Sequence, residues 1–496
     1  MIKIKNEVVK QQKNFWSQCL FHPTDAVEDS WGRRILDRIS ADKAIKTIRI
    51  YTMFEDIVYI GENDEICYDF RVSDLRLDYL VEKGFDLLLA YAGMPDCIAA
   101  STSNKTSVSK NKTRYKGKMW NTSPPKDFAV WEEICYEYTK HIVERYGMER
   151  VSRWRVQCFN EPDIPAFFLS EYPNNNAETA MKYRFPLFCQ MYAAFERGVR
   201  RVSDELTIGG PSLAMWPEFL GGFLDFVKEK NLKLDFISIH NYGSSPTRLN
   251  NGVTPYSVQN NMNIQSKYVK IVADHGFGHV PILVDEWGMA SEGYRTRETC
   301  PDLLARENEV FSAYFAKQIH QLTYSDFKME MLCICLSGQH EMTVDFSGFR
   351  NFFTLNFIAK PIYNAYIMAY KLGETVLSAE EGENQFVLPT KDENGNYAVM
   401  ISYSSENFKE DIPDITEQVT FEEDIVGKKV TVWCIDKNTT NPYRVWERAG
   451  EPEVDDEWRK ILREEGKMKP IAAFTAEENS LTLNLSANST FLITVE

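Results

Sequence analysis

Residues 153–162 read RWRVQCFNEP, a strand-like run that ends on two polar residues, Asn160 and Glu161. A longer amphipathic stretch follows over 177–202, where apolar residues recur at the spacing of a helix. This unit of a short strand and a longer helix repeats along the chain as far as Gly373. Such alternation is typical of a parallel sheet that is covered by helices.

The number of strands decides between two architectures of this class. Eight are expected, more than a doubly wound sheet usually has, and no glycine-rich phosphate loop follows any of them. The sequence therefore predicts a closed (β/α)₈ barrel over residues 13–372. The expected strands are Phe15–Leu20, Thr47–Tyr51, Asp86–Tyr91, Arg153–Cys158, Thr207–Gly209, Asp235–Ile239, Pro281–Asp285 and Met331–Leu336. The expected helices include Ser73–Lys83, Phe128–Tyr146, Ala177–Val202, Pro217–Lys230, Val258–Ala273 and Leu303–Leu322.

The chain changes character after Gly373, where short alternating runs are separated by polar turns such as Glu393-Asn-Gly-Asn396. This pattern predicts an antiparallel β-sandwich domain over 373–496, to which residues 1–12 add a strand. The expected strands are Asn384–Leu388, Tyr397–Tyr403, Val419–Glu422, Lys429–Cys434, Ile471–Phe474, Leu481–Leu485 and Thr490–Val495.

The composition of the 496 residues, with 44% hydrophobic and 26% charged residues, is that of a globular protein. Its 72 acidic and 56 basic residues give a formal net charge of −16, which repels nucleic acid and anionic membranes. The first residues lack the apolar stretch of a signal peptide, and no apolar run reaches the roughly 18 residues of a membrane span. We therefore expect no nucleic-acid partner, no membrane and a cytoplasmic location. The ten scattered cysteines predict buried thiols rather than disulfides.

Two glutamates lie at the carboxyl ends of predicted strands. Glu161 follows the fourth strand, and Glu286 follows the seventh in the sequence PILVDEWG over 281–288. Because barrels of this kind collect their active sites at the carboxyl ends of the strands, both should face the same cup. The sequence lacks the ligand clusters that a metal- or cofactor-dependent barrel enzyme would need, so no metal or cofactor is predicted. Chemistry that needs only two carboxylates is typical of glycoside hydrolysis.

Short motifs occur in a specific order along nearly the whole chain. They are Tyr68-Asp-Phe70, Leu77-Asp78-Tyr-Leu80, Gly93-Met94-Pro95, Thr122-Ser-Pro-Pro-Lys126, Val143-Glu-Arg-Tyr-Gly147, Gly209-Gly-Pro211, Asp235-Phe-Ile-Ser-Ile-His240-Asn-Tyr242, Lys360-Pro361, Asn441-Pro-Tyr443 and Trp446-Glu-Arg-Ala-Gly450. Together they resemble family 39 of the glycoside hydrolases, particularly its bacterial β-xylosidase branch. Asn160-Glu161-Pro162 resembles the acid/base motif shared by the wider clan of retaining glycosidases built on a (β/α)₈ barrel.

The resemblance implies roles for the polar residues at the strand ends. Glu161 would be the acid/base and Glu286 the nucleophile, while Asn160 would hydrogen-bond the 2-hydroxyl of the sugar. His240 and Tyr242 follow strand six, where the family places a sugar-binding histidine and an aromatic residue that hydrogen-bonds the nucleophile.

Three further positions are matched to the family. Arg49, inside strand two, resembles the arginine that keeps the nucleophile ionised, and a buried arginine also needs a carboxylate partner for its own stability. Trp287 is expected either to form a floor for the sugar or to pack in the core. Glu341 is matched to the acid that caps the hydroxyls of xylose.

The chain also departs from the family at two places. Tyr51 stands where the β-xylosidases have a histidine, and Cys333-Ile-Cys-Leu336 lacks the tryptophan that forms a wall of their sugar pocket. We expect both changes to affect sugar recognition and to leave the carboxylate pair unaffected.

The sequence thus predicts a retaining exo-glycosidase without cofactors, with a β-D-xylosidase acting on short xylo-oligosaccharides as the first choice. The alternatives are the same mechanism on a β-galactoside, an α-L-arabinoside or a β-glucoside and, more remotely, a non-catalytic carbohydrate-binding protein. A homodimer or homotetramer is left open. Retention predicts that the two carboxyl groups lie about 5 to 5.5 Å apart, against about 6.5 to 9.5 Å for inversion. It also predicts a raised pKa for Glu161 and a lowered pKa for Glu286.

Overall fold

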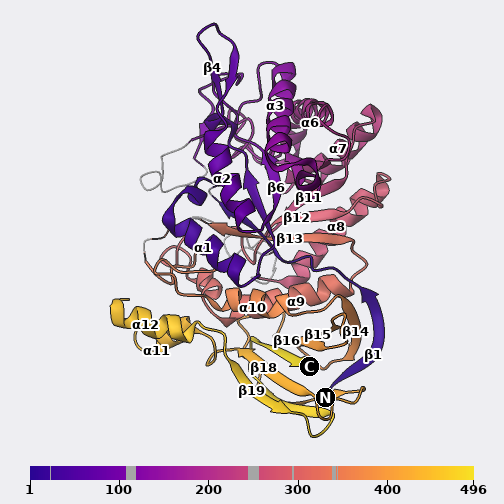
Figure 1. Cartoon of the computed structure of the whole chain (residues 1–496), viewed down its shortest axis with the longest axis vertical. Coiled ribbons are helices and arrows are strands. Elements are labelled where there is room, and N and C mark those ends of the chain that lie inside the picture. Colours follow the sequence, from indigo (N-terminus) through magenta and orange to yellow (C-terminus); the bar gives the residue numbers. More distant parts are fainter. Residues whose placement is uncertain (23, 108–118, 244–255, 293–294, 338–341, 343) are drawn as a thin grey trace.

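The predicted barrel is present in the computed structural model, which describes the whole chain except residues 23, 108–118, 244–255, 293–294, 338–341 and 343. Its parallel strands follow one another in chain order and close on themselves, in the upper part of Figure 1. They are β2 (Gln18–His22), β3 (Thr47–Tyr51), β6 (Asp86–Tyr91), β9 (Arg155–Cys158), β10 (Thr207–Leu213), β11 (Phe236–Asn241), β12 (Ile282–Trp287) and β13 (Met329–Ser337).

Helices connect these strands and surround the barrel. Polar side chains cap the amino ends of several of these helices. Asp29, Asp127 and Asn308 each accept a hydrogen bond from a backbone N–H of the first turn. The α-helices are α1 (Ser30–Ala41), α2 (Arg71–Glu82), α3 (Phe128–Tyr146), α4 (Met148–Val151), α5 (Ala177–Thr179), α6 (Phe185–Arg200), α7 (Pro217–Lys230), α8 (Val258–Asp274), α9 (Glu309–Tyr324) and α10 (Pro361–Tyr370). Short 3₁₀-helices occur at η1 (Thr24–Glu28), η2 (Phe54–Asp56) and η4 (Pro301–Arg306), and a π-helical turn occurs at η3 (Ala180–Arg184).

Two barrel strands, β2 and β9, begin two or three residues later than the sequence predicts. The side chain of Asn14 accepts hydrogen bonds from the backbone N–H groups of Trp16 and Ser17, both at 3.0 Å, and so forms a turn before β2. Backbone hydrogen bonds of helical type from Arg153 and Trp154 likewise delay the start of β9. In both places the backbone N–H groups donate hydrogen bonds within a local turn. They are therefore not available for pairing with a neighbouring strand, and the strand begins further along the chain.

Two small hairpins project from the carboxyl ends of barrel strands. They are formed by β4 (Val58–Ile60) with β5 (Ile66–Tyr68) and by β7 (Lys105–Thr106) with β8 (Trp120–Asn121). Strand β7 of the second hairpin lies in the lysine-rich segment Thr102–Lys118 that the sequence predicts as a long loop. Residues 108–118 of that segment lie outside the described residues.

The second part of the molecule is a β-sandwich, drawn in orange and yellow at the bottom of Figure 1. Residues at the amino end of the chain form β1, which pairs antiparallel with β14 and parallel with β17. Strand β14 was not predicted from the sequence. The hydrogen-bonded order is β19-β18-β21-β16-β15-β14-β1-β17-β20. The bounds are β1 (Ile2–Gln11), β14 (Thr375–Glu380), β15 (Gln385–Lys391), β16 (Tyr397–Tyr403), β17 (Ile415–Phe421), β18 (Lys429–Ile435), β19 (Pro470–Thr475), β20 (Ser480–Leu485) and β21 (Ser489–Val495).

Strands β16 and β21 of the sandwich bury both of their faces. Alternate residues such as Val399 on β16 and Ile493 on β21 enclose a core with Val419 of β17 from the other half of the sheet. Their neighbours Met400 and Leu492 point the other way and belong to the core of the barrel. Helix α9 contacts β15, β16 and β21 on that side. The sandwich is therefore packed against the barrel through α9.

Two helices that the sequence did not predict, α11 (Pro442–Arg448) and α12 (Asp456–Glu465), lie between β18 and β19. Tyr443, Trp446 and Leu462 form a small buried cluster with Phe346, which belongs to the segment between β13 and α10. The guanidinium of Arg463 donates to the backbone carbonyl of Asn356 in the same segment. The sandwich thus contacts a loop at the carboxyl end of the barrel.

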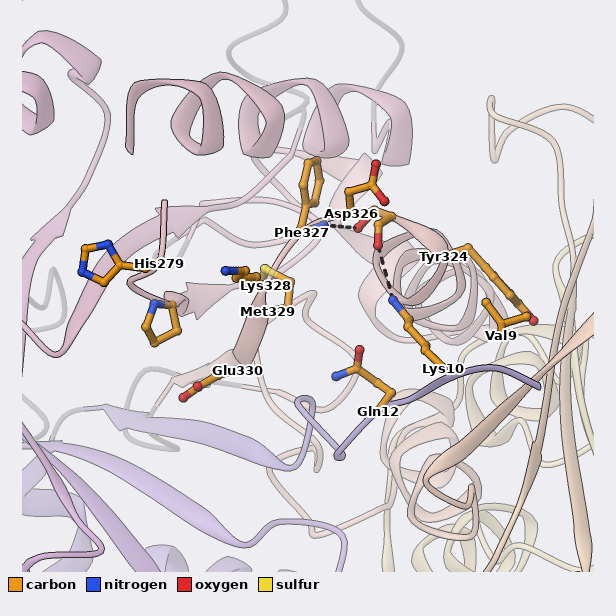
Figure 2. Close-up of a pocket in the computed structure, with 12 residues that line it drawn as sticks. Val9, Lys10, Gln12, His279, Tyr324, Asp326, Phe327, Lys328, Met329 and Glu330 are labelled. Carbon is orange, nitrogen blue, oxygen red and sulfur yellow. Dashed lines mark hydrogen bonds between the residues drawn. The ribbon is translucent and has the colours of Figure 1, made fainter. Parts of the chain in front are cut away.

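A cavity of about 600 Å³ lies at the opposite end, beside the amino ends of β12 and β13 (Figure 2). Its lining includes Lys10, Gln12, His279, Lys328 and Glu330. The ammonium group of Lys10 donates to the backbone carbonyl of Ser325 there, at 3.3 Å. This cavity is separate from the strand ends that carry the predicted site. Among the described residues, no helix has both the length and the apolar character that crossing a membrane requires.

Candidate active site

The two predicted glutamates lie close together at the carboxyl ends of β9 and β12. Glu161, His240 and Glu286 each offer one side-chain atom, and these three atoms lie within 4.8 Å of one another. The side chain of Glu161 is 15% exposed and that of Glu286 is 9% exposed. A carboxyl oxygen of one glutamate therefore lies within 4.8 Å of a carboxyl oxygen of the other, at the edge of the buried core.

Hydrogen bonds to the neighbouring strand position Glu161. Its backbone N–H donates to the carbonyl of Ser212 at 3.0 Å. Two residues further on, the buried carboxylate of Asp163 accepts from the N–H groups of Ala214, Met215 and Trp216 at 2.8 to 3.0 Å. The segment after β9 is thus attached to the segment after β10, which limits the positions that the Glu161 side chain can reach.

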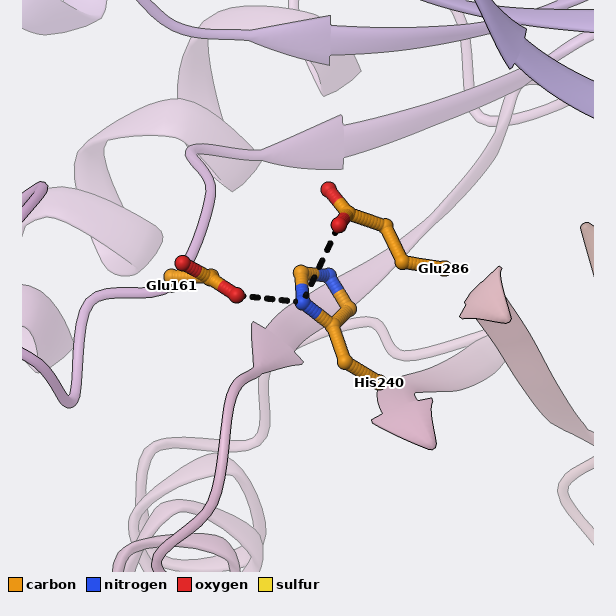
Figure 3. A group of neighbouring side chains, drawn as sticks. All are labelled: Glu161, His240 and Glu286. Atoms are coloured by element: carbon orange, nitrogen blue, oxygen red, sulfur yellow. Dashed lines mark hydrogen bonds and ion pairs between the residues drawn. The ribbon is translucent and has the colours of Figure 1, made fainter. Parts of the chain in front are cut away.

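His240, at the end of β11, lies between the two glutamates (Figure 3). Its Nδ1 is 2.7 Å from Oε1 of Glu161 and 3.7 Å from Oε2 of Glu286. Its Nε2 is 3.1 Å from Oγ of Ser212 and 3.7 Å from Oδ1 of Asp285. The histidine therefore links the two carboxyl groups to a polar layer beneath them.

Three side chains donate hydrogen bonds to the carboxylate of Glu286. Arg49 donates through Nη1 to Oε1 at 2.7 Å, and the Tyr51 hydroxyl donates to the same oxygen at 3.1 Å. The Tyr242 hydroxyl donates to Oε2 at 2.6 Å and itself accepts from Nη1 of Arg350 at 3.0 Å. Arg49 and Tyr242 therefore contact Glu286 as the sequence predicts. The contact of Tyr51 corrects the expectation that this departure from the family leaves the carboxylate pair unaffected.

A polar layer that the sequence did not predict lies beneath the glutamates. The buried carboxylate of Asp285 is 3.2 Å from Nη2 of Arg49, and its Oδ2 accepts from the Ser212 hydroxyl at 2.8 Å and from the Gln157 amide at 3.0 Å. Arg49 also donates to Ser212 Oγ at 2.9 Å. The positive charge of the fully buried Arg49 is thus shared between Asp285 and Glu286.

Asn160 is held with its amide nitrogen free of protein partners in the described part of the chain. Its Oδ1 accepts from Nη2 of Arg49 at 2.7 Å, which fixes the orientation of the side chain. Its Nδ2 makes no hydrogen bond to any described residue. This buried amide nitrogen is therefore left able to donate to a further partner.

Burial and charge move the pKa values of the two glutamates in opposite directions. Burial raises the pKa of Glu161, the charge of Glu286 adds to this, and the hydrogen bond from His240 offsets only part of the rise. Burial also acts to raise the pKa of Glu286, but the charges of His240 and Arg49 outweigh it and hold that pKa well below its usual range. The directions are those the sequence predicts, with His240 as a cause that was not foreseen.

The same groups determine the protonation of His240. Burial opposes the charged form of the ring, but the negative charges of Glu286 and Asp285 outweigh burial and raise the pKa of His240 well above its usual value. A protonated imidazole has no lone pair to offer a metal ion, and its Nδ1 already contacts Glu161. The three neighbouring side chains are therefore better suited to holding protons than to holding a cation.

One predicted site residue of the described part of the chain packs in the core instead of contacting the carboxylates. Trp287 is fully buried, and its ring lies 5.8 Å from the rings of Phe311 and Phe315 on α9. These contacts support the packing alternative, and a role as a floor for the sugar stays a prediction. Glu341 lies outside the described residues.

A closed parallel barrel that carries a buried carboxyl pair at its carboxyl end, joined to a β-sandwich, defines the molecule as a glycosidase of the barrel type. The chain belongs to the glycosyl hydrolases family 39, whose family model matches residues 1–477. This match confirms the family that the sequence motifs resemble.

Similar proteins support the same assignment. The chain is 24% identical to a β-xylosidase of Caldicellulosiruptor saccharolyticus over an alignment of 514 positions, which covers 95% of this chain and 93% of that protein. It is 22% identical to a β-xylosidase of Geobacillus stearothermophilus over 406 positions, covering 78% and 71%. A monomeric β-xylosidase from Caulobacter crescentus CB15 superposes with a TM-score of 0.81 at 18% identity and covers 100% of this chain and 99% of its own. The last comparison shows a shared fold.

Proposed function

We propose that this glycosidase acts by a retaining mechanism, with Glu286 as the nucleophile and Glu161 as the acid/base. The observation that supports this most directly is the approach of the two carboxyl groups, since one oxygen of each lies within 4.8 Å of an oxygen of the other. An inverting enzyme must hold a water between the anomeric carbon and its base, which requires a separation of about 6.5 to 9.5 Å. The short separation leaves room for direct attack by a carboxylate.

The opposite pKa shifts give each glutamate the protonation that its role needs. Glu161, with its raised pKa, carries the proton that the leaving oxygen takes in the first step. Glu286, with its lowered pKa, is ionised and attacks the anomeric carbon to form a glycosyl ester. In the second step Glu161, now ionised, takes a proton from the water that displaces Glu286.

Neighbouring side chains have supporting roles in this proposal. Arg49 and Tyr242 orient the carboxylate of Glu286 through hydrogen bonds of 2.7 and 2.6 Å. The Nδ2 of Asn160 donates to the 2-hydroxyl of the sugar, a contact that strengthens as the ring flattens in the transition state. His240 holds Glu161 and binds the sugar beside it.

For the sugar we propose a β-D-xyloside, released from the end of short xylo-oligosaccharides. The similarity to two proteins named β-xylosidases supports this choice at 24% and 22% identity. A β-galactoside, an α-L-arabinoside or a β-glucoside remains the alternative. Nitrophenyl glycosides of the four sugars, assayed side by side, separate these cases, and the products formed from xylotriose show whether cleavage is at the chain end.

Replacement of each glutamate by alanine tests the mechanism. Glu286→Ala should lose turnover on every substrate, and azide should restore it with a glycosyl azide of the configuration opposite to that of the substrate. Glu161→Ala should cleave a dinitrophenyl glycoside with a burst, because this leaving group needs no proton, and should have almost no activity on a disaccharide. Azide should rescue the second variant with retained configuration. Proton NMR of the azide products gives both configurations.

A glutamate away from the site provides the matched control. Glu330 lies at the amino end of β13 with a 48% exposed side chain, and Glu330→Ala should behave as the wild type. Products of the same configuration from the two variants, or wild-type turnover of a disaccharide by either of them, would show that the roles are assigned wrongly.

A further inference from the structure

The two oxygens of Glu286 have different surroundings. Oε1 accepts two hydrogen bonds, from Nη1 of Arg49 at 2.7 Å and from the Tyr51 hydroxyl at 3.1 Å. Oε2 accepts from the Tyr242 hydroxyl at 2.6 Å and lies 3.7 Å from Nδ1 of His240. In Figure 3 the ring of His240 lies between Glu286 and Glu161, so Oε2 is on the side of Glu286 that faces the second carboxyl group.

From this asymmetry we infer that Oε2 is the oxygen that attacks the sugar, and that Tyr51 is a positioning residue whose hydroxyl holds the other oxygen, Oε1, through both steps of the reaction. The inference rests on the proposed retaining mechanism and adds a residue and a choice of oxygen to it. A sugar bound between the two glutamates approaches Glu286 from the direction of Glu161, and this is the side of Oε2. Oε1 faces the buried polar layer around Arg49.

The position of Tyr51 is fixed by its strand and its neighbours. It lies two residues after Arg49 on β3, so both side chains point to the same face of the strand. Its backbone N–H donates to Oγ of Thr24 at 3.0 Å, and its ring contacts the ring of Trp120 edge-on at 5.8 Å. The side chain is therefore held before any substrate arrives.

The Tyr51 hydroxyl keeps its proton at the pH values at which glycosidases work. Burial, together with the negative charge of Glu286, raises the pKa of Tyr51 well above its usual value. A phenol that stays neutral can only donate to a carboxylate oxygen, since the carboxylate has no proton to give. The contact with Oε1 is thus a hydrogen bond from a neutral donor to a charged acceptor, which is among the stronger kinds.

The chemistry of the two steps shows where this hydrogen bond has its effect. In the first step a lone pair of Oε2 forms the bond to the anomeric carbon, the bond to the aglycone oxygen breaks, and that oxygen takes the proton of Glu161. Glu286 is then a neutral ester, with Oε1 as its carbonyl oxygen. In the second step the water oxygen bonds to the anomeric carbon, the electron pair of the Oε2 bond returns to Glu286, and Glu161 takes a proton from the water.

The negative charge on Glu286 is therefore lost in the first step and regained in the second. A donor to Oε1 stabilises the carboxylate more than it stabilises the ester. Removing the donor should slow the second step, in which the charge returns. The first step should change little, because the lost stabilisation also raises the free energy of the starting carboxylate.

The test measures the two steps separately in Tyr51→Phe. A 2-deoxy-2-fluoro glycoside with a dinitrophenyl leaving group forms the ester in a step that releases the phenol, and the washed ester enzyme then regains activity at the rate of the second step. We expect this reactivation to be about 10- to 100-fold slower than in the wild type, as for the loss of a hydrogen bond to a charged group. The rate of ester formation should change by less than about threefold.

Tyr91→Phe is the matched control, since Tyr91 lies on the neighbouring strand β6 and is fully buried, but its hydroxyl contacts Oγ1 of Thr139 at 2.8 Å. Both of its rates should equal those of the wild type. If Tyr51→Phe folds poorly, 3-fluorotyrosine at position 51 keeps the shape and makes the hydroxyl a better donor. Its reactivation should then be at least as fast as in the wild type.

Failure of the inference and failure of the proposed mechanism give different results. If wild-type peptide mapping finds the fluorosugar on Glu286, but Tyr51→Phe reactivates like the wild type, the role of Tyr51 is wrong and the mechanism stands. Equal slowing of both steps also contradicts the inference, because a merely structural role would have that effect. If no ester forms on Glu286 in the wild type, the mechanism fails and the inference fails with it.

Discussion

Phe159 and Glu161 both have a left-handed backbone conformation, with φ of 64° and 45°, on either side of Asn160. Residues other than glycine rarely adopt this region, and each such residue costs on the order of 1 kcal/mol. Extended backbone would place the side chains of Asn160 and Glu161 on opposite faces. With the left-handed residues, the side chain of Asn160 contacts Arg49 while that of Glu161 approaches Glu286.

The pKa shifts of the glutamates predict a bell-shaped dependence of kcat/KM on pH. Activity needs Glu161 protonated, so it should fall as the pH rises through the raised pKa of Glu161. It also needs Glu286 ionised, so it should fall on the acidic side only as the pH drops through the lowered pKa of Glu286. A pH series on an aryl glycoside with a poor leaving group measures both limbs. A basic limb that persists in Glu161→Ala on such a substrate would contradict the assignment.

Arg49→Lys should move the acidic limb to higher pH. The arginine contacts Glu286, Asp285, Asn160 and Ser212 at once, and a lysine ammonium cannot reach all four. The pKa of Glu286 should therefore rise, and kcat/KM at neutral pH should fall about 100-fold. The exposed Arg145 pairs with Asp78 on the outside of the barrel, and Arg145→Lys is the control. Unchanged activity with an unchanged acidic limb would exclude the role given to Arg49.

The sequence predicts those site residues that lie at strand ends, and it does not predict the layer beneath them. Glu161, Glu286 and His240 each follow an apolar run, which marks the carboxyl end of a barrel strand. Ser212 gives no comparable signal, and the sequence does not show which side chains Asp285 contacts, because the partners of both residues lie on other strands far away in the sequence. A charge at the end of the apolar run of β12 could have indicated that Asp285 needs a buried cation.

At the scale of elements, the buried carboxylate of Asp163 attaches the segment after β9 to the start of α7. It accepts three backbone N–H groups, at residues 214 to 216, that would otherwise be buried without partners. Asp163→Ala should lower the free energy of unfolding by about 2 to 4 kcal/mol in urea titrations. It should also lower kcat, since the turn that positions Glu161 is released. Asp204→Ala, with a 73% exposed side chain, should change neither quantity.

The elements that the sequence predicts are those in which apolar residues recur with a strong periodicity. The eight barrel strands and the long helices α3 and α7 lie where the pattern places them, to within a few residues. Helices α11 and α12 have 7 and 10 residues, too few to be stable alone, and they depend on contacts with Phe346 of a distant loop. Strand β14 shows no regular alternation of buried and exposed residues. Its pairing with β1 and β15 is not encoded locally.

At the scale of the whole molecule, α9 lies between the barrel and the sandwich, and residues of β16 and β21 that face it belong to the core of the barrel. Barrel and sandwich should therefore unfold in one transition. Leu492 of β21 is fully buried at this contact, and Leu492→Ala should lower the free energy of unfolding by about 2 to 5 kcal/mol. Denaturant titrations followed by tryptophan fluorescence and by circular dichroism measure this. Ile461→Ala, on the exposed side of α12, is the control. Two separate transitions in the wild type would contradict the coupling.

Two expectations at this scale stay predictions. One is the division of the chain into domains at residue 373, and the other is assembly into a homodimer or homotetramer. Size-exclusion chromatography with light scattering measures the mass in solution.

The place of β1 between β14 and β17 has a consequence for how the molecule is made on the ribosome. At about 5 to 20 residues per second, roughly 20 to 80 s pass between the synthesis of Ile2–Gln11 and that of Ile415–Phe421. Through that interval the nascent chain carries Ile2 and Ile4 without their final neighbours, while every strand of the barrel emerges. Strand β1 is therefore among the last elements to reach its native place, although it is synthesised before every strand of the barrel.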